Sequence, residues 1–312
     1  MVLRLLNQIV TNHKQTMVKH LGVLFLLISL LSCEKDIEIE LDDSTVSLVV
    51  DASIENGKPP VVILSKSFNY FAQIDPSILS KSFVRNAAVY VSDGIKKTKL
   101  REDSITSQGT SLYFYTNDPA APQSWIIGKT NTAYTLDITA DGREYRASTT
   151  IPAFNRQIDS LWWESPKGPL QPEDSNRVLL MLRGTDKPGL GSYVRYFTKV
   201  NNEPFLPGFN SVFDDQVIDG TSYTVTVDKG LDKNAEFKPE NLYFKRGDTV
   251  VFKLADIDKK TYDFWRTLEF SFQSVGNPFS SPVKVLGNVS GGALGCFAGY
   301  AAQFRQIIIP KR

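Results

Sequence analysis

The chain has 312 residues, with 35 basic and 34 acidic side chains. This balance offers no basic surface to a polyanion, so we expect no nucleic-acid partner. The sequence contains two histidines and two cysteines, which restricts imidazole chemistry, disulfides and thiolate metal sites to very few positions.

Residues 17–32 have the organisation of a signal peptide. A short cationic start at Lys19 is followed by eleven uncharged residues, whereas a membrane-spanning helix needs about 20 apolar residues. Met17 by itself opens an adequate signal, so the true start is either Met1 or Met17. We expect residues 1–32 to be a lipoprotein signal peptide that is removed from the mature protein.

The apolar run ends in Leu30-Leu31-Ser32-Cys33, which resembles the lipobox of bacterial lipoproteins. The resemblance implies cleavage before Cys33 and attachment of diacylglycerol to its thiol, so Cys33 is the predicted lipidation site. Anchoring by several acyl chains is stable, because each buried methylene contributes about 0.8 kcal/mol. The alternatives are an uncleaved membrane anchor and an apolar core segment of a cytoplasmic protein.

Residues 33–45 are predicted to form an acidic tether behind the lipidated cysteine. Six of the ten residues from Glu34 to Asp43 are acidic, which is too much charge for a packed segment. Acidic residues at this place also resemble the surface-export signal of Bacteroidota lipoproteins, which implies the outer face of the outer membrane. A plain solvated linker is the alternative.

Removal of residues 1–32 takes away both histidines, His13 and His20, so the mature chain is expected to contain no imidazole. Three basic residues and no acidic residue are lost with them, which leaves 32 basic and 34 acidic residues. Nucleophile activation by histidine and zinc sites of the histidine type are thereby excluded. With Cys33 lipidated, Cys296 has no second thiol and is interpreted as a small packed residue. We expect a non-enzymatic protein without cofactor or metal.

Carboxylates are the remaining candidates for catalysis or calcium binding. A carboxylate pair of the glycosidase type and a calcium site are the functional interpretations. Chance clustering among 34 acidic residues, beside turns or at a helix start, is the simpler one. The densest acidic groups are Asp214-Asp215 with Asp219, and Asp256 with Asp258.

Residues 46–152 are predicted to form an immunoglobulin-like β-sandwich. Apolar and polar residues alternate from Val46 to Ile54, as in a half-buried strand. The clearest hairpin joins residues 134–138 to residues 145–149 through Asp141-Gly142, a pair that suits the positive φ angles of a type I′ turn. Roughly seven short strands over this range favour the sandwich and a fold class that is mainly β.

Residues 153–312 are predicted to form a second β domain with one helix, after a boundary at Pro152. Apolar residues recur every three or four positions from Asp258 to Ser274, which fits an amphipathic helix capped by Asp258. We expect its aromatic face to pack on the core, with a partner groove as the alternative. The glycines from Gly291 to Gly299 are interpreted as a tight bend in a β structure. The candidate strands are residues 178–182, 193–200, 222–227, 249–254 and 304–309.

Two aromatic segments between these strands are candidate binding loops. Aromatic rings next to turn-forming residues are typical of recognition surfaces, although rings in loops also fold back onto a core. The candidate residues are Phe68, Tyr70 and Phe71 in the first segment, and Phe205, Phe209 and Phe213 in the second.

Short stretches along the whole mature chain carry a family resemblance. They include Cys33 to Glu38, the strand Leu48 to Ala52, the hairpin from Tyr134 to Pro152, Gln157 to Leu161, Phe213-Asp214-Asp215, Asp219-Gly220, Asn277-Pro278-Phe279, Gly287-Asn288-Val289 and Gly291-Gly292. In this order they resemble a family of Bacteroidota outer-membrane lipoproteins, that of domain of unknown function 4249. Members of such families are often encoded beside TonB-dependent outer-membrane receptors, which implies an accessory role in capture or uptake. The resemblance carries over no catalytic residues.

The leading functional hypothesis is a lipid-anchored outer-membrane binding protein, exposed on the cell surface, accessory to a TonB-dependent transporter and non-catalytic. Its expected contacts are the membrane, through the N-terminal lipid, and a TonB-dependent receptor, while the ligand stays unnamed. The alternative is a structural or adhesive β-sandwich protein of the cell envelope. A third hypothesis is a carboxylate-dependent glycan hydrolase that uses Asp214, Asp215, Asp256 or Asp258.

Overall fold

The computed structural model describes residues of the unit that begins at Thr45. The predicted signal peptide, Cys33 and the acidic tether lie outside the described residues. Within the described part of the chain, no helix combines the length and the apolarity that crossing a membrane requires. The described residues are 46–68, 80–107, 110–167, 176–232, 237–274 and 283–311.

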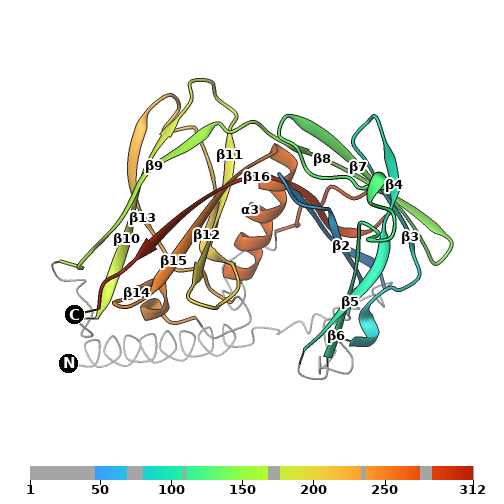
Figure 1. Ribbon diagram of the computed structural model, residues 1–312, viewed down its shortest axis with the longest axis horizontal. Coiled ribbons are helices and arrows are strands. Elements are labelled where there is room, and N and C mark those ends of the chain that lie inside the picture. Colours follow the sequence, from blue (N-terminus) through green and yellow to red (C-terminus); the bar gives the residue numbers. More distant parts are fainter. Residues whose placement is uncertain are drawn as a thin grey trace, which may run out of the picture. The chain divides into compact units, whose positions relative to one another are not determined.

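Strands make up most of this unit, so the prediction of a mainly β fold is confirmed (Figure 1). Among the described residues, α3 (Lys259–Ser274) is the one long helix. The strands are β1 (Leu48–Glu55), β2 (Val61–Lys66), β3 (Ala88–Ser92), β4 (Lys97–Lys99), β5 (Arg101–Ser107), β6 (Thr110–Thr116), β7 (Thr132–Ala140), β8 (Arg143–Ile151), β9 (Arg156–Glu164), β10 (Arg177–Asp186), β11 (Tyr193–Val200), β12 (Leu206–Asp214), β13 (Ser222–Val227), β14 (Phe244–Lys245), β15 (Thr249–Ile257) and β16 (Leu294–Ile308).

Facing sheets in the N-terminal part form the predicted immunoglobulin-like sandwich. One face contains β1, β2, β6 and β5, and the sheet opposite has the order β4-β3-β7-β8. Val50 and Ile54 of β1 share one buried core with Leu136 and Ile138 of β7. The alternation of apolar and polar residues in these strands therefore places their apolar side chains between the sheets.

The hairpin between β7 and β8 turns at Asp141-Gly142, as predicted. Both residues have positive φ angles, 49° for Asp141 and 74° for Gly142, which is the backbone of a two-residue type I′ turn. The register runs without a shift from the Ala140–Arg143 pair to the Thr132–Ile151 pair. The hairpin therefore ends at the residue before Pro152.

The C-terminal part contains a second pair of facing sheets and the predicted helix. The sheet of β9, β10, β13 and β14 packs against β11, β15 and β16, with Leu180 of β10 and Phe252 of β15 in the common core. Helix α3 begins after Asp258, whose Oδ1 accepts a hydrogen bond from the backbone N–H of Thr261 over 2.8 Å. This is the N-cap that the sequence predicts.

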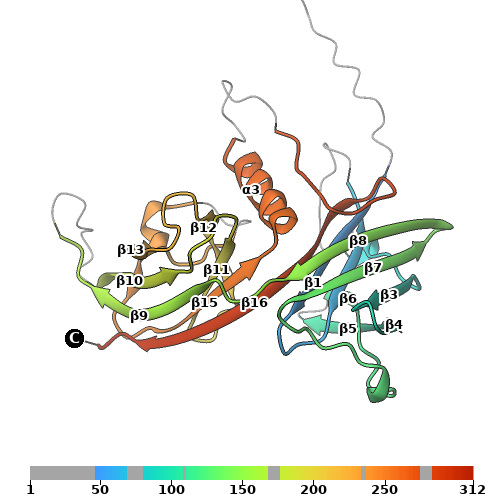
Figure 2. The same ribbon diagram turned by 90° about the horizontal axis from the view of Figure 1, so that it is seen from above.

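Strand β16 joins the N-terminal and C-terminal parts (Figure 2). Its first half pairs in parallel with β1 and its second half pairs antiparallel with β15. Within the described ranges, one sheet therefore has eight strands in the order β12-β11-β15-β16-β1-β2-β6-β5. Phe297 of β16 lies in the N-terminal core, whereas Ile307 packs on the C-terminal one. This sheet takes strands from both sides of Pro152. The division into two domains at Pro152 stays a prediction.

The glycine-rich stretch at the start of β16 forms a tight bend, as predicted. Gly291 and Gly292 have φ angles of 82° and 81°, which side chains with a Cβ rarely adopt. Gly295 has a φ of 102°, and a Cβ added there would lie 2.0 Å from the carbonyl oxygen of Val50. The absence of a side chain at Gly295 therefore lets β16 approach β1.

Residues 204–213, which the sequence predicts as a loop, form most of strand β12 instead. This strand lies at the edge of its sheet and pairs with β11, with a register shift opposite Arg195 to Phe197. An edge position tolerates Pro207, which cannot donate to a ladder. Gly208 makes room for the ring of Tyr196, whose hydroxyl would lie 1.8 Å from an added Cβ. The turn-forming residues thus mark an irregular edge strand, and the loop prediction is wrong.

Candidate binding cavity

The three phenylalanines of the second predicted binding segment line different cavities. Phe209 and Phe213 belong to β12, and Phe205 directly precedes it. Phe213 lines a cavity of about 800 Å³, while Phe209 and Phe205 each line another, smaller one. The prediction that they gather in one loop is therefore wrong. Strand alternation alone would place these three rings, which are four residues apart, on one face; the register shift between β11 and β12 interrupts the alternation and separates them.

The first predicted binding segment is described only in part. Phe68 follows β2 and is half-buried, while Tyr70 and Phe71 lie outside the described residues. Binding by this segment stays a prediction.

The cavity at Phe213 opens between the sheets of the C-terminal part, on the side of the edge strands β12 and β13. It has a volume of about 800 Å³, which is within the usual range for small-molecule sites. We name it the sandwich cavity. Its walls include Leu182 of β10, Tyr196 of β11, Phe213 of β12, Val225 of β13 and Phe252 of β15, and α3 adds Phe270.

Large apolar side chains of the sandwich cavity are open to solvent. Phe213 is 47% exposed and Val217 is 94% exposed, and Val225 and Phe270 also keep much of their surface in water. Exposed apolar side chains that gather around a hollow mark sites of ligand or partner binding. These four residues form the rim of the cavity.

Aromatic rings lead from the rim into the interior. Tyr196 stacks on Phe213, with ring centroids 6.1 Å apart, and lies 5.9 Å from the ring of Phe252 at a tilt of 33°. Phe213 is exposed, whereas Tyr196 and Phe252 are buried. A ligand that enters at the rim would therefore meet a continuous aromatic wall.

Three polar side chains at the cavity, Asp214, Tyr262 and Arg266, bind one another. The Tyr262 hydroxyl donates to Asp214 Oδ2 over 3.1 Å, and Arg266 Nη1 donates to the Tyr262 hydroxyl over 2.7 Å. Arg266 also lies 3.9 Å from the Asp214 carboxylate. Asp214 and Arg266 therefore neutralise each other.

Asp228 differs from Asp214 in having no ion-pair partner among the described residues. It follows β13 and lines the cavity near Tyr196. Within the described part of the chain, no group donates a hydrogen bond to its carboxylate. Burial raises the pKa of Asp228 above its ordinary value, with no cation to offset the effect. Burial, together with the charges of Asp228 and Glu269, also raises the pKa of Tyr196.

Buried charges fix α3 to the sheet beside the cavity. The guanidinium of Arg195 lies 3.4 Å from the ring centroid of Trp265, and its Nε donates to Ser211 Oγ over 3.1 Å. Glu269 Oε2 accepts a hydrogen bond from the backbone N–H of Ser211 over 3.0 Å, and its other oxygen accepts from the hydroxyl. Paired in this way, buried charges hold one geometry. Helix α3 thereby places Phe270 at the rim.

A second buried charged group borders the cavity at Arg156. Its Nε donates to Asp186 Oδ1 over 3.1 Å, and the same oxygen accepts from the Ser192 hydroxyl. Burial raises the pKa of Asp256 to about 7, although the backbone N–H groups of Asn155 and Arg156 and the charge of Arg156 act in the opposite direction. The positive charge of Arg156 therefore acts on the neighbouring carboxylates Asp186 and Asp256.

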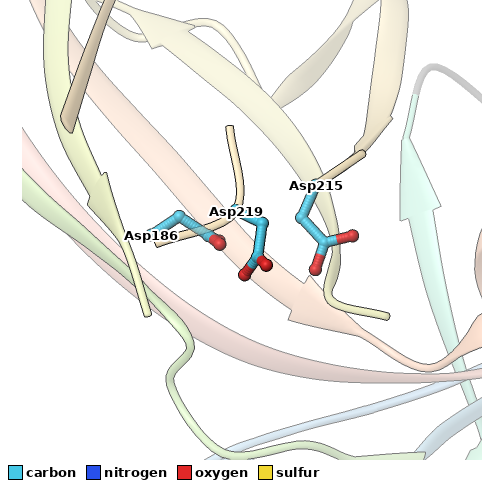
Figure 3. Close-up of side chains that lie close together, drawn as sticks. All are labelled: Asp186, Asp215 and Asp219. Carbon is cyan, nitrogen blue, oxygen red and sulfur yellow. The ribbon is translucent and has the colours of Figure 1, made fainter. Parts of the chain in front are cut away.

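Asp186, Asp215 and Asp219 each present an oxygen within 4.8 Å of the other two (Figure 3). Such a group could hold a cation, but its members also have partners in the fold. Asp215 Oδ2 accepts hydrogen bonds from the backbone N–H groups of Gly191 and Ser192 over 2.8 and 2.7 Å. Although burial acts against it, these N–H groups lower the pKa of Asp215. The carboxylates therefore hold two loops together, and the expectation of a protein without metal stays a prediction.

The family comparison covers nearly the whole described fold. One family model matches residues 34–306, a range that contains α3 and all described strands except the last two residues of β16. The chain belongs to this family. It is described as Domain of unknown function (DUF4249). None of the curated proteins matches the sequence. The DUF4249 family that the resemblance implied is thus confirmed, and its description assigns no activity.

The carboxylates of the hydrolase hypothesis have internal roles in this DUF4249 chain. Asp258 caps α3 and also accepts a hydrogen bond from the backbone N–H of Thr150. Asp256 accepts from backbone N–H groups, Asp215 holds a loop, and Asp214 binds Tyr262. Of these four, Asp214 alone lines the sandwich cavity. The absence of catalysis stays a prediction.

Sequence reasoning missed the interior of the cavity in this DUF4249 protein. Tyr196 lies in a correctly predicted strand, but the alternation pattern does not say that its ring borders open space. Asp228 follows another correctly predicted strand, where an acidic residue usually indicates a solvated turn. Arg156 carries no signal of burial, because its partner Asp186 is distant in the sequence. All three positions depend on contacts between strands, which a local pattern does not contain.

Proposed function

We propose that this DUF4249 protein is a lipid-anchored binding protein of the outer membrane, exposed on the cell surface and accessory to a TonB-dependent transporter. In this proposal it has no catalytic activity and holds its ligand in the sandwich cavity. The observation that carries the proposal is the cavity of about 800 Å³ with an exposed apolar rim.

The chemistry of the cavity supports binding without catalysis. Its walls are mainly apolar and aromatic, with a few polar groups, as in sites that hold small molecules. Two of these polar groups, Asp214 and Arg156, are paired inside the fold. The mature chain is expected to lack histidine, so no imidazole is available as a general base.

The anchored location rests on the sequence alone. The lipobox before Cys33 and the acidic residues behind it support an outer-membrane lipoprotein that faces outward. A tether of residues 33–45 would let the β unit reach a receptor in the same membrane, because an extended chain spans about 3.3 Å per residue.

The experiment that tests this proposal is purification of intact complexes from native membranes in mild detergent. We expect the protein to co-purify with a TonB-dependent receptor. The Cys33→Ser variant should appear in the soluble fraction and lose the receptor, because it lacks the lipid that keeps both in one plane. The matched control is Cys296→Ser, which removes the buried thiol of β16 and leaves the lipobox unchanged, so it should stay in the membrane.

Repeated purification of the wild-type protein without any receptor would refute the transporter-accessory function. Membrane retention of Cys33→Ser would refute anchoring through this cysteine.

A further inference from the structure

The sandwich cavity contains one carboxylate, that of Asp228, without an ion-pair partner among the described residues. Asp228 lines it without a hydrogen-bond donor from the described residues, and Glu269 lies on the same wall, bound to Ser211. Both carboxylates act on Tyr196 through their charge. A carboxylate that is partly removed from water is unfavourable unless a donor or a cation meets it.

Each of the two arginines that line the cavity lies against a carboxylate, although Nη2 of Arg156 has no hydrogen-bond partner among the described residues. Arg156 is bound to Asp186, and Arg266 lies against Tyr262 and Asp214. Among the described lining residues there is no lysine. Asp228 therefore has no cation partner among the described residues, and an ammonium group of a ligand would supply the complementary charge.

The ring of Tyr196 strengthens this preference for a positive charge. Its face belongs to the aromatic wall with Phe213 and Phe252, and an ammonium group over an aromatic face gains about 0.5–2 kcal/mol. A carboxylate and an aromatic wall at one place form a site for an ammonium group. A ligand carboxylate would instead be repelled by Asp228 and Glu269.

The apolar rim of the cavity favours a ligand whose uncharged part is apolar. Phe213, Val217, Val225 and Phe270 are exposed apolar side chains that a hydrocarbon chain or ring would cover. Covering this surface is favourable by about 25 cal/mol per Å² of apolar area. The ligand that fits the rim and the interior together has an apolar body and one charged end.

We propose, on the basis of the proposed binding function, that the sandwich cavity takes an amphipathic amine. Its ammonium group binds the Asp228 carboxylate beside the ring of Tyr196, and its apolar body lies between the rim residues. Asp228 is the residue that determines the charge of the ligand, and Phe213 is a contact for any apolar body.

The test uses the mature chain with Cys33→Ser, purified from the soluble fraction. The probes are n-octylamine, n-octanol and octanoate, which have equal chain lengths and different end groups, and affinity is measured by titration calorimetry. We expect octylamine to bind at least tenfold more tightly than octanoate, with octanol between them. Asp228→Asn should weaken octylamine binding at least tenfold and leave octanoate binding equal or stronger.

Two further variants locate the site. Phe213→Ala should weaken all three probes by similar factors, because it removes an apolar contact that each of them makes. Asp141→Asn is the matched control, since it makes the same charge change in an exposed turn and should change no affinity. Circular dichroism and thermal unfolding of each variant confirm that it is folded.

The outcomes separate this inference from the proposed function. Equal affinities of the three probes, or an unchanged octylamine affinity in folded Asp228→Asn, overturn the amine specificity alone. No binding of any probe, or no effect of Phe213→Ala on any of them, overturns the cavity as a ligand site and with it the binding function.

Discussion

Asp228 and Asp256 are both carboxylates in surroundings that disfavour their charge, but they face different neighbours. Asp256 Oδ1 accepts hydrogen bonds from the backbone N–H groups of Asn155 and Arg156, while its other oxygen is buried without a partner among the described residues. Asp228 borders an open cavity and has none of these contacts. The unfavourable charge of Asp256 is thus a property of the fold, whereas that of Asp228 is available to a ligand.

Asp256→Asn should change how the stability of the protein depends on pH. The folded state holds the proton of Asp256 up to about pH 7, whereas an unfolded chain releases it near the ordinary value of 3.8. The folded state therefore binds more protons in this window, and the free energy of unfolding falls as pH rises through it. Asparagine keeps the accepting oxygen and does not ionise, so the variant should lose this fall. Its size is at most about 4 kcal/mol, because one pKa unit corresponds to about 1.4 kcal/mol.

The measurement is urea unfolding of the wild type and Asp256→Asn at several values between pH 4 and pH 8. Asp141→Asn, with its exposed side chain, is the control for removal of one negative charge. Parallel stability curves for Asp256→Asn and the wild type would contradict the raised pKa.

Gly295 controls how closely β16 approaches β1. The parallel pairing of the two strands places Gly295 opposite Val50, and the space for a side chain there is taken by the Val50 carbonyl. Gly292, in the preceding bend, has a positive φ of 81° but no atom within 4 Å of an added Cβ. The two glycines thus share a backbone requirement and differ in crowding.

Gly295→Ala should lower the free energy of unfolding by roughly 3 kcal/mol or more, because it adds a clash with backbone to the strain of a positive φ. Gly292→Ala adds the strain alone, about 1–2 kcal/mol. Denaturant unfolding of both variants measures the difference. Equal losses would show that the approach of β16 to β1 does not depend on Gly295.

Local patterns predict the individual elements well and the edge strand β12 badly. The strands 193–200 and 222–227 are observed as predicted, and α3 begins one residue after its predicted cap. Regular alternation and helical spacing are properties of neighbouring residues, so they can be detected without the fold. In β12, Pro207 and Gly208 break the alternation. Pro207 is tolerated because the strand lies at the edge of the sheet, and Gly208 leaves room for the ring of Tyr196.

At the scale of the whole molecule, β16 makes the N-terminal sandwich depend on the C-terminal end of the chain. Phe297 and Ala301 belong to the N-terminal core, and β16 is the parallel neighbour of β1. Without β16, β1 would present an unpaired edge, and the core would lose the ring of Phe297. The N-terminal sandwich is therefore incomplete within its own residues.

A fragment of residues 46–152 should fail to fold by itself, because it lacks β16. We expect no cooperative urea transition and no near-ultraviolet circular dichroism from the fragment, whereas residues 46–312 should give both. Addition of residues 153–312 to the fragment should restore the signal if the two pieces assemble. Cooperative unfolding of the isolated fragment would show that the predicted boundary at Pro152 separates independent domains.

The sequence by itself determined the strands with regular alternation, the helix with its Asp258 cap, the turn at Asp141-Gly142 and the family, because these depend on neighbouring residues or on the order of short motifs. The tertiary structure decided that β16 pairs with β1, and that Tyr196, Phe213 and Asp228 line one cavity. These features join segments that are far apart in the chain, such as Asn56 and Ala302, which hydrogen-bond across 246 positions. No local pattern encodes such contacts, since they form only when the sheets pack and leave a space between them.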